Sequence, residues 1–457
     1  MLTRLRIQNF KAWQDTGGIR LAPLTVFFGT NSSGKTSLLQ FLLMLKQTVL
    51  SPDRRRVLNF GDSRSLVDLG VWPEMIFRHD AGRVLSFNLE WLGPTDPEMP
   101  DDEQDLQPLR FEAKVGRPED EQATVELNSF KYQLRPRSKD SFVLGIERTG
   151  SGKYRLESSH RRRSLKILDL SAPPAHFHSL AFERLGKAAH SEAIFDLQRL
   201  QLLLEGELDS ILYLGPIRVG PSRLYVWAGD PPEDVGVEGE ETIAALLAAP
   251  NQPFKLANHQ AETSLQMIVA SWLQQLGILE SFEIRAIAPH RKEYEVFVRA
   301  AGMKDAVNLT DVGFGVSQVL PVLVQLLYVE RRSTLIFEQP ELHLHPRAQS
   351  ALADIFIDAL QMQEEGHPRE VQLLVESHSE HLLRRLQRRV AENKLTPDQV
   401  ALYFCKPGPE GSTIEELKLD EYGNISNWPE NFFGDEVGDL AAMTEAAMRR
   451  HLGEEES

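Results

Sequence analysis

The chain has 457 residues, 42% of them hydrophobic and 25% charged, which is the composition of an ordinary globular protein long enough for two or three packed units. Its 50 Lys and Arg residues stand against 66 Asp and Glu residues, and the formal net charge of -16 opposes indiscriminate binding to phosphate backbones. The single cysteine, Cys405, excludes an intramolecular disulfide framework, and the lack of a signal-peptide pattern or a long apolar stretch predicts a cytoplasmic protein without membrane contact.

The first elements predicted along the chain surround a glycine-rich turn. Residues Met1–Trp13 approximate the alternating pattern of a half-buried strand, and Leu21–Phe28 form a more apolar strand that stops at Gly29. The run Lys35–Leu50 is apolar nearly all round, which predicts a helix buried on several sides. We therefore expect the turn to connect a buried strand directly to a buried helix.

The middle of the chain changes its pattern twice. Between Val84 and Leu170, short alternating segments separated by Gly, Pro and acidic turns predict an antiparallel β region. Ala181–Leu212 and Ala261–Leu276 then show apolar residues at helical spacing. The Gly- and Pro-rich stretch Gly215–Gly239 predicts an irregular loop.

Late in the chain, helices and strands alternate, and this order implies a parallel sheet. The predicted elements are the helix Val316–Val329, the strand Ser333–Phe337, the helix Pro346–Gln361 and the strand Val371–Glu376. The fold class predicted is therefore α/β, with a core split between the two ends of the chain. The predicted segments are residues 1–83 and 301–408 as the two parts of the core, 84–180 as an antiparallel β-rich region, 181–300 as a helical and irregular insertion, and 409–457 as an acidic C-terminal region.

The strongest motif is Gly29-Thr-Asn-Ser-Ser-Gly-Lys-Thr36, which fits the pattern GxxxxGK[ST] of a phosphate-binding loop. Its glycines allow a tight turn, Lys35 places a positive charge on the β- and γ-phosphates, and Thr36 offers a hydroxyl to Mg²⁺. The residues predicted to bind the nucleotide here are Gly29, Asn31, Ser32, Ser33, Gly34, Lys35, Thr36 and Ser37. The alternative is a plain Gly/Ser turn that caps a helix, and the complete motif between strand and helix argues against it.

A second cluster lies at the end of an apolar strand. Glu338 directly follows the strand, at the edge where a parallel sheet collects its ligands, so Glu338 is predicted to bind Mg²⁺ together with Thr36. Glu341 is the candidate general base that polarises the attacking water. The nearby His343 and His345 raise the alternative of a zinc site, although their i, i+2 spacing on a loop differs from that of a helical zinc motif.

Two further signals involve a histidine and a pair of glycines. His378 follows the last predicted strand, where it would reach the γ-phosphate or the attacking water. Gly313, Gly315 and Ser317 precede a helix and form a second predicted anion-binding nest. One nucleotide does not need two separate phosphate-binding sites of a single chain, so this nest is predicted to bind the nucleotide held by another copy. A capping histidine and a plain glycine-rich helix cap are the alternatives.

Taken together, these motifs resemble the ABC-like ATPases, and most closely the prokaryotic AAA-family group that includes the ATPase portions of the overcoming-lysogenization-defect nucleases and RecF- and SMC-type proteins. The segments that carry the resemblance are Asn9-Phe10-Lys11, the phosphate loop, the glycine nest, Glu338–Pro346 and Glu376–Ser379. The segment Gly423–Phe433 looks like an uncharacterised domain that commonly ends stand-alone members. The resemblance implies a P-loop NTPase fold of the ABC-ATPase head type, with a mixed or parallel sheet core.

The resemblance also implies an activity and partners. We expect an ATPase that converts ATP to ADP and phosphate with Mg²⁺, and a head-to-tail dimer or higher oligomer in which the phosphate loop of one copy faces the nest of the other. Such a dimer would be a sensor or switch that gates a separate effector protein, such as a nuclease or toxin, or a nucleic-acid ligand, in antiphage defence. The alternatives are a RecF- or SMC-like DNA-repair ATPase, an ATP-dependent scaffold with little hydrolysis, and a small-molecule P-loop kinase.

The sequence departs from the family pattern at several points. Gln339 occupies the place of the catalytic glutamate of transporter-type members, so hydrolysis is expected to be slow or to depend on Glu341. Gly313 replaces the serine of the usual signature, which leaves Ser317 and backbone N–H groups as substitutes. The C-terminal region lacks the acidic arrangement of a Toprim nuclease, so the nuclease activity is expected on another chain.

Overall fold

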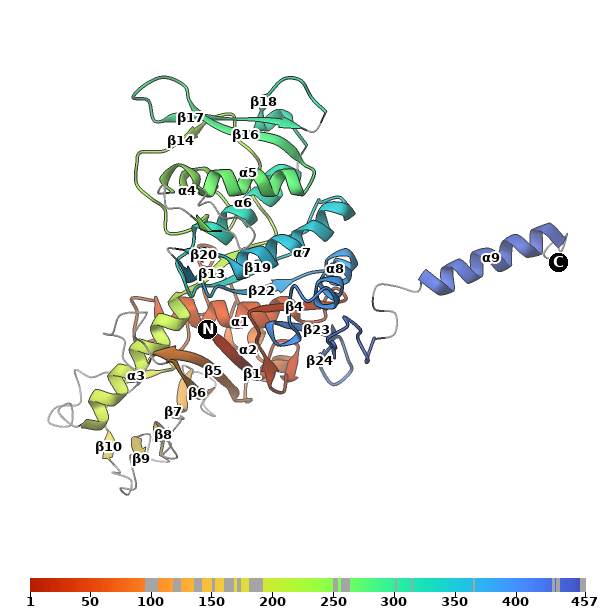
Figure 1. The fold of residues 1–457 in the computed structure, drawn as a ribbon. Coiled ribbons are helices and arrows are strands. Elements are labelled where there is room, and N and C mark those ends of the chain that lie inside the picture. Colours follow the sequence, from red (N-terminus) through yellow and green to blue (C-terminus); the bar gives the residue numbers. More distant parts are fainter. Residues whose placement is uncertain are drawn as a thin grey trace.

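The computed structural model describes residues 1–94, 106–117, 125–134, 142–149, 153–159, 168–170, 174–180, 192–249, 254–255, 264–300, 302–313, 315–364, 366–429, 432 and 436–452. Its centre is a six-stranded sheet in the order β13-β19-β22-β4-β23-β24 (Figure 1). These strands are β13 (Ile211–Leu214), β19 (Thr334–Glu338), β22 (Gln372–Glu376), β4 (Leu24–Gly29), β23 (Val400–Lys406) and β24 (Thr413–Glu416). The first five run parallel, and β24 is antiparallel to β23.

The parallel strands have the composition that burial on both faces requires. All residues of β19 and β22 are buried, and both strands are nearly continuous apolar runs. Helix α1 (Lys35–Val49) packs against one face, beside Phe27 of β4. Helices α6 (Gly315–Tyr328), α7 (Pro346–Gln361) and α8 (Glu380–Ala391) pack against the other face. The core is therefore a sheet between two helical layers, which confirms the predicted α/β fold class.

A second, nine-stranded sheet is antiparallel and packs on the α1 side of the core. Its order is β10-β9-β8-β7-β6-β5-β1-β2, with β3 paired to β1. The strands are β1 (Leu2–Phe10), β2 (Trp13–Asp15), β3 (Ile19–Arg20), β5 (Leu85–Pro94), β6 (Leu106–Gly116), β7 (Glu126–Leu134), β8 (Phe142–Arg148), β9 (Tyr154–Ser159) and β10 (Leu168–Leu170). Helix α3 (Glu192–Asp209) shares the hydrophobic cluster of this sheet and α1. The N-terminal strand thus belongs to this sheet and not to the central one.

A third layer covers the α6 side of the molecule, at the top of Figure 1. Its elements are β14 (Tyr225–Val226), α4 (Thr242–Ala248), α5 (Leu265–Gln275), β16 (Leu279–Ala286), β17 (Glu293–Ala300) and β18 (Val307–Asn308). The shorter elements are α2 (Trp72–Met75), β11 (Pro174–Ala175), β12 (Ser179–Leu180), β15 (Phe254–Lys255), β20 (Gln363–Glu364), β21 (His367–Pro368) and the 3-10 helices Phe77–His79, Leu309–Asp311 and Pro397–Gln399. Together the three layers enclose two hydrophobic clusters, one on each face of the central sheet.

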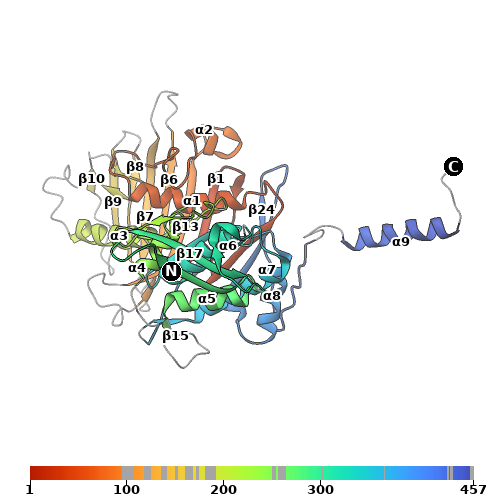
Figure 2. The ribbon, with the colours of Figure 1, turned by 90° about the horizontal axis from the view of Figure 1, so that it is seen from above.

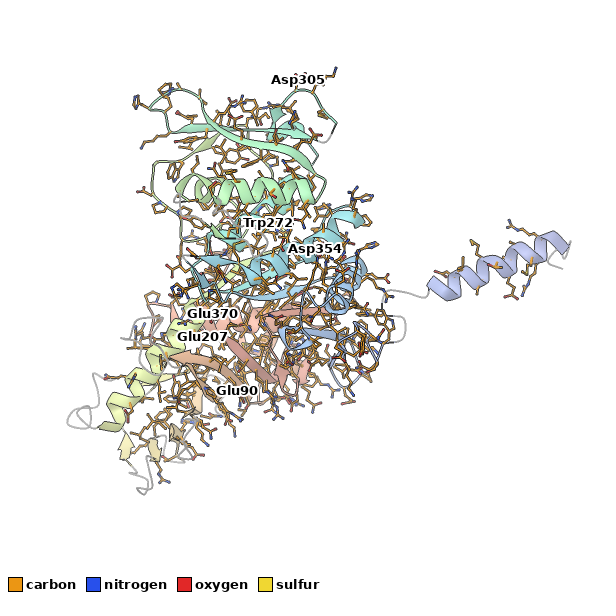
Figure 3. All side chains as sticks on the ribbon, in the orientation of Figure 1. Glu90, Glu207, Trp272, Asp305, Asp354 and Glu370 are labelled. Atoms are coloured by element: carbon orange, nitrogen blue, oxygen red, sulfur yellow. The ribbon has the colours of Figure 1, made fainter. Side chains whose placement is uncertain are left out.

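Ion pairs join α7 to α8 on the outside of the core. Asp354 of α7, labelled in Figure 3, accepts hydrogen bonds from Arg385 at 2.7 Å and from Arg389 at 2.6 Å. Arg384 and Arg388 of α8 form ion pairs with glutamates four residues away along the chain. The arginine-rich face of α8 is therefore largely neutralised within the chain.

The last described element, α9 (Glu436–Leu452), stands apart from the rest of the molecule in two perpendicular views (Figures 1 and 2). The segment before it is anchored by Phe432, whose ring lies 4.4 Å from that of Phe404 and 5.8 Å from that of Phe28. Within the described residues, no helix is both long and apolar enough to cross a membrane. The division of the chain into five segments stays a prediction.

Candidate functional site

The phosphate-loop motif connects β4 to α1, as its sequence predicts. Gly29 has a φ of 142°, and a Cβ atom there would collide with the carbonyl oxygen of Cys405 on β23. Gly34 has a φ of 90° and would bring a Cβ atom to 3.0 Å from the indole ring of Trp13. Both positions therefore require glycine, because of the positive φ and the close neighbour.

Trp13 packs against the phosphate loop at Gly34 and Ser37. Its indole N–H donates to the carbonyl of Gly34 at 3.1 Å and to the hydroxyl of Ser37 at 2.9 Å, and its side chain is fully buried. The Ser37 hydroxyl in turn donates to the Gly34 carbonyl at 2.6 Å. Ser37 is thus engaged beneath the loop, on the side of Trp13.

Lys35 closes the loop on itself. Its ammonium group donates to the carbonyl of Gly29 at 3.0 Å and to that of Thr30 at 2.8 Å, and it lies 4.0 Å from the carboxylate of Glu376. Burial lowers the pKa of Lys35, while the negative charge of Glu376 acts in the opposite direction. The ammonium is thus buried within the loop, held by two carbonyl oxygens and close to one carboxylate.

Two strand-end carboxylates face this loop. Glu338 ends β19 and Glu376 ends β22, and the two are direct partners in the parallel ladder. The Thr36 hydroxyl donates to Glu376 at 2.8 Å, and the Tyr213 hydroxyl donates to Glu338 at 2.9 Å. Burial and the charge of Glu376 raise the pKa of Glu338 to about 7, and burial also raises the pKa of Glu376.

Glu341 is a third buried carboxylate at the same edge. One of its oxygens accepts the Ser377 hydroxyl at 2.8 Å and the backbone N–H of His378 at 2.7 Å. Its other oxygen, Oε2, has no hydrogen-bond partner among the described residues. Burial raises the pKa of Glu341. An unpaired carboxylate oxygen held rigidly in a buried site is costly unless it accepts from a water or a ligand.

The carboxylates and Thr36 fit a divalent cation with few protein ligands. Among the described residues, no three His, Cys, Asp or Glu side chains converge in the manner of a metal cage. Mg²⁺ usually takes only one or two carboxylates and completes its shell with water and phosphate oxygens. The hydroxyl of Thr36, already bonded to Glu376, supplies the further oxygen that such a site uses.

Arg218 ties the tip of β19 to the first turn of α6. Its guanidinium is buried and donates to the carbonyl of Gln318 at 3.1 Å and to that of Glu338 at 3.0 Å. Burial lowers its pKa to about 10. Arg223, the other arginine of the irregular loop, pairs with Asp311 at 2.7 Å on the surface. Both arginines are therefore held by contacts within the chain.

The other predicted site residues divide by position into those at the carboxyl edge of the central sheet and those of the glycine nest. Asn31 and Ser32 are exposed on the loop and Ser33 is buried beneath it. Gln339 has a φ of 45°, and its backbone N–H donates to the Glu376 carbonyl at 2.9 Å, which fixes the turn after β19. His378 follows β22 and is exposed. All of these residues lie at the carboxyl edge of the central sheet.

The glycine nest lies elsewhere, at the start of α6. Gly313 is exposed, and a Cβ atom on Gly315 would lie 3.2 Å from the carbonyl of His343. Ser317 is buried within the first turns of the helix. Because Arg218 joins this turn to β19, and β22 separates β19 from β4, the nest flanks the site on the side away from the phosphate loop. The structure thus brings the loop, the glutamates and His378 together and leaves the nest apart.

Three residues at the site escaped the sequence analysis. Glu376 ends an apolar strand just as Glu338 does, and this position was the signal that could have identified it. Tyr213 lies on β13, whose first two residues were predicted to continue a helix. Trp13 carries no motif, because its role depends on the packing of β2 against the loop.

Two family models match the chain. The family described as "AAA domain, putative AbiEii toxin, Type IV TA system" matches residues 24–384, and "Protein of unknown function (DUF3696)" matches residues 395–443. These matches confirm the two resemblances drawn from the motifs. No curated protein matches the chain.

Among solved structures, an SMC head domain from Thermotoga maritima is 9% identical with a TM-score of 0.39, covering 92% of this chain and 99% of that one. An SMC head bound to the C-winged helix domain of ScpA is 13% identical with a TM-score of 0.40, covering 92% of this chain and 98% of that one.

Proposed function

Because the chain belongs to the AAA-domain family of the AbiEii type, we propose that it binds ATP with Mg²⁺ and hydrolyses it to ADP and phosphate as a dimeric switch. The observation that carries this proposal is the network at the sheet edge, in which Lys35 and Thr36 of the loop both contact Glu376, the ladder partner of Glu338. Few arrangements other than a phosphate and metal site gather a buried lysine and several carboxylates of raised pKa.

In this proposal each residue has a defined task. The loop N–H groups and Lys35 bind the phosphates, and Thr36 with Glu338 and Glu376 holds Mg²⁺, which neutralises charge on the phosphate oxygens. Glu341, through its unpaired oxygen, accepts a proton from the attacking water. His378 donates a hydrogen bond to the γ-phosphate. Gln339 has no basic group, so its part is to fix the turn that carries Glu341.

The dimer is proposed because of the position of the nest. Gly313 is exposed and lies apart from the phosphate loop of its own chain, so its backbone would meet the nucleotide of a second copy in a head-to-tail pair. We further propose that the nucleotide state gates a separate effector protein, such as a nuclease or toxin, in antiphage defence, in line with the toxin named in the family description. A nucleic-acid ligand is the second candidate for what the switch controls.

A scaffold that binds ATP with little hydrolysis is the alternative that Gln339 favours. Phosphate release by wild type and by Glu341→Gln separates the two. If Glu341 is the base, the substitution lowers the rate about 100-fold or more while ATP still binds, and Lys35→Ala abolishes binding. The exposed Glu421 provides a matched control, since Glu421→Gln is expected to leave the rate unchanged. Wild type that binds ATP and releases no phosphate would establish the scaffold.

A further inference from the structure

Helix α9 presents an apolar face that nothing in the described chain covers. Leu440 is 60% exposed, Met443 62% and Met448 60%. In proteins, most of the stability of a helix comes from packing of one face against a partner. A helix that stands away from the body with such a face is therefore an interaction surface (Figures 1 and 2).

The apolar side chains follow the spacing of a helix–helix seam. Leu440, Met443, Thr444, Ala447 and Met448 stand at positions i, i+3, i+4, i+7 and i+8, which share one side of an α-helix. Thr444 and Ala447 are small and lie near the middle of this face, so a second helix can approach closely between the two methionines. We call these five residues the α9 seam. The opposite side carries Ala442, Ala446 and charged residues.

The charged residues beside the α9 seam favour a second, antiparallel α9 as the partner. Asp439 near the start of the helix and Arg450 near its end are eleven residues apart, close to three full turns, so they lie along the same flank. Both are exposed, and neither makes an ion pair with any described residue. A second α9 running antiparallel would place Arg450 opposite Asp439 twice, once at each end, whereas in a parallel pair the same flanks of the two helices lie on opposite sides of the seam and these two residues do not meet.

We propose that α9 is a dimerisation helix that packs its seam antiparallel against α9 of a second copy of this chain. Such a pair is self-complementary, as a twofold interface requires, and Thr444 lies at its centre because it is midway between Asp439 and Arg450. The pairing needs no nucleotide, so it goes beyond the ATP clamp.

Because α9 follows closely after a residue packed in the core, pairing of two α9 helices would also bring the two cores close together. Three residues separate Phe432, which packs on Phe28 directly before the phosphate loop, from the start of α9 at Glu436. Two paired helices on such short tethers hold two ATPase cores at a high effective concentration. The free chain is therefore a dimer joined at its C-terminal helices before any ATP is bound.

A single introduced cysteine tests the geometry. Cys405 is fully buried, so Thr444→Cys adds one reactive thiol to the chain. Without nucleotide, mild oxidation of Thr444→Cys is expected to give a disulfide-linked dimer at least about tenfold faster than that of Ala442→Cys, on the opposite side of the helix. Equal rates for the two variants would overturn the proposal. The substitution Lys35→Ala is expected to leave cross-linking intact, so loss of ATP binding and loss of pairing are distinguishable.

A charge exchange tests the identity of the partner. Asp439→Arg and Arg450→Asp are each expected to weaken the nucleotide-free dimer about three- to tenfold in sedimentation equilibrium, because each removes both symmetric pairs. The double variant restores the pairs in reverse and is expected to return to within about twofold of wild type. Failure of the double variant to recover would overturn the antiparallel self-pairing. Circular dichroism checks that all three variants keep the secondary structure of wild type.

Discussion

Trp13 connects the first sheet to the phosphate loop through one indole N–H, which donates to the carbonyl of Gly34 and to the hydroxyl of Ser37. A buried hydrogen bond of this kind contributes about 1 kcal/mol, and here it fixes the residue at which the loop enters α1. Trp13→Phe keeps most of the ring and removes the donor. We expect about a fivefold weaker ATP affinity by calorimetry.

Trp227→Phe is the control for this prediction. The Trp227 indole N–H also donates to a backbone carbonyl, that of Asp230 at 2.9 Å, but on an exposed loop of the third layer. Its substitution is expected to leave the ATP affinity unchanged. An equal loss in both variants would mean that Trp13 acts through general stability and not through the loop.

The candidate site could be predicted from the sequence only in part, for a physical reason. Glu338, Glu341 and His378 each follow an apolar strand. Because parallel strands bring their carboxyl ends to one edge of the sheet, the local pattern was enough to predict that these residues lie close to Lys35. Glu376 has the same position, yet its bond to Thr36 depends on β22 lying between β19 and β4. No local pattern encodes that strand order.

Among the elements, those with strong local periodicity were predictable and those that depend on long-range pairing were not. Helix α7 spans Pro346–Gln361 as predicted, with His345 accepting a hydrogen bond from the N–H of Arg347 at its start. Strand β13 directly follows α3, so its residues Ile211 and Leu212 continue an apolar pattern that predicted helix. The pairing of β1 with β5 joins segments about eighty residues apart, which only the packed structure selects.

A buried histidine in the turn between β11 and β12 is expected to make the free energy of unfolding depend on pH. His178 is fully buried, its Nε2 lies 2.8 Å from a carboxylate oxygen of Glu205 on α3, and its ring stacks on that of His176. Burial lowers the pKa of His178 below 6.5, against the charge of Glu205, and Arg54 also disfavours the protonated form. The unfolded chain therefore binds this proton more readily, and stability present above pH 6.5 is lost as the pH falls.

We expect the free energy of unfolding in urea to decrease between pH 7.5 and pH 5.0 by about 1–2 kcal/mol more in wild type than in His178→Gln. The exposed His381 provides the control, since His381→Gln is expected to keep the wild-type pH dependence. The same slope in wild type and His178→Gln would show that other groups determine the acid sensitivity.

Phe432 is an aromatic anchor of the C-terminal segment. Phe432 is buried among Phe28, Phe404 and Trp428. Phe432→Ala removes most of this contact, and truncation of a buried phenylalanine costs about 3–5 kcal/mol. We expect the described residues from β24 onward to exchange amide hydrogens faster, while β19 and β22 stay protected. Tyr422, which is 70% exposed in the same segment, is the control, because Tyr422→Ala removes no buried contact.

At the scale of the whole molecule, the net negative charge and the paired arginines of α8 argue against a broad nucleic-acid surface. The formal net charge is -16, and Arg385 and Arg389 are both committed to Asp354. Binding to nucleic acid through phosphate contacts requires cations that are free to replace counterions. The proposed head-to-tail arrangement calls for a test of its own.

Mixing two inactive variants tests whether the nest of one copy completes the site of the other. Lys35→Ala has a defective loop and an intact nest, whereas Gly313→Asp has an intact loop and a nest that repels phosphate. Open space surrounds Gly313, so this side chain does not disturb the fold. In a mixed head-to-tail dimer one composite site is intact, and with random pairing about a quarter of the wild-type phosphate release is expected to return. Lys35→Ala mixed with Glu341→Gln damages the loop side of both sites and is expected to stay inactive. If the first mixture also stays inactive while a tag carried by only one variant co-purifies the other, each site acts within a single chain.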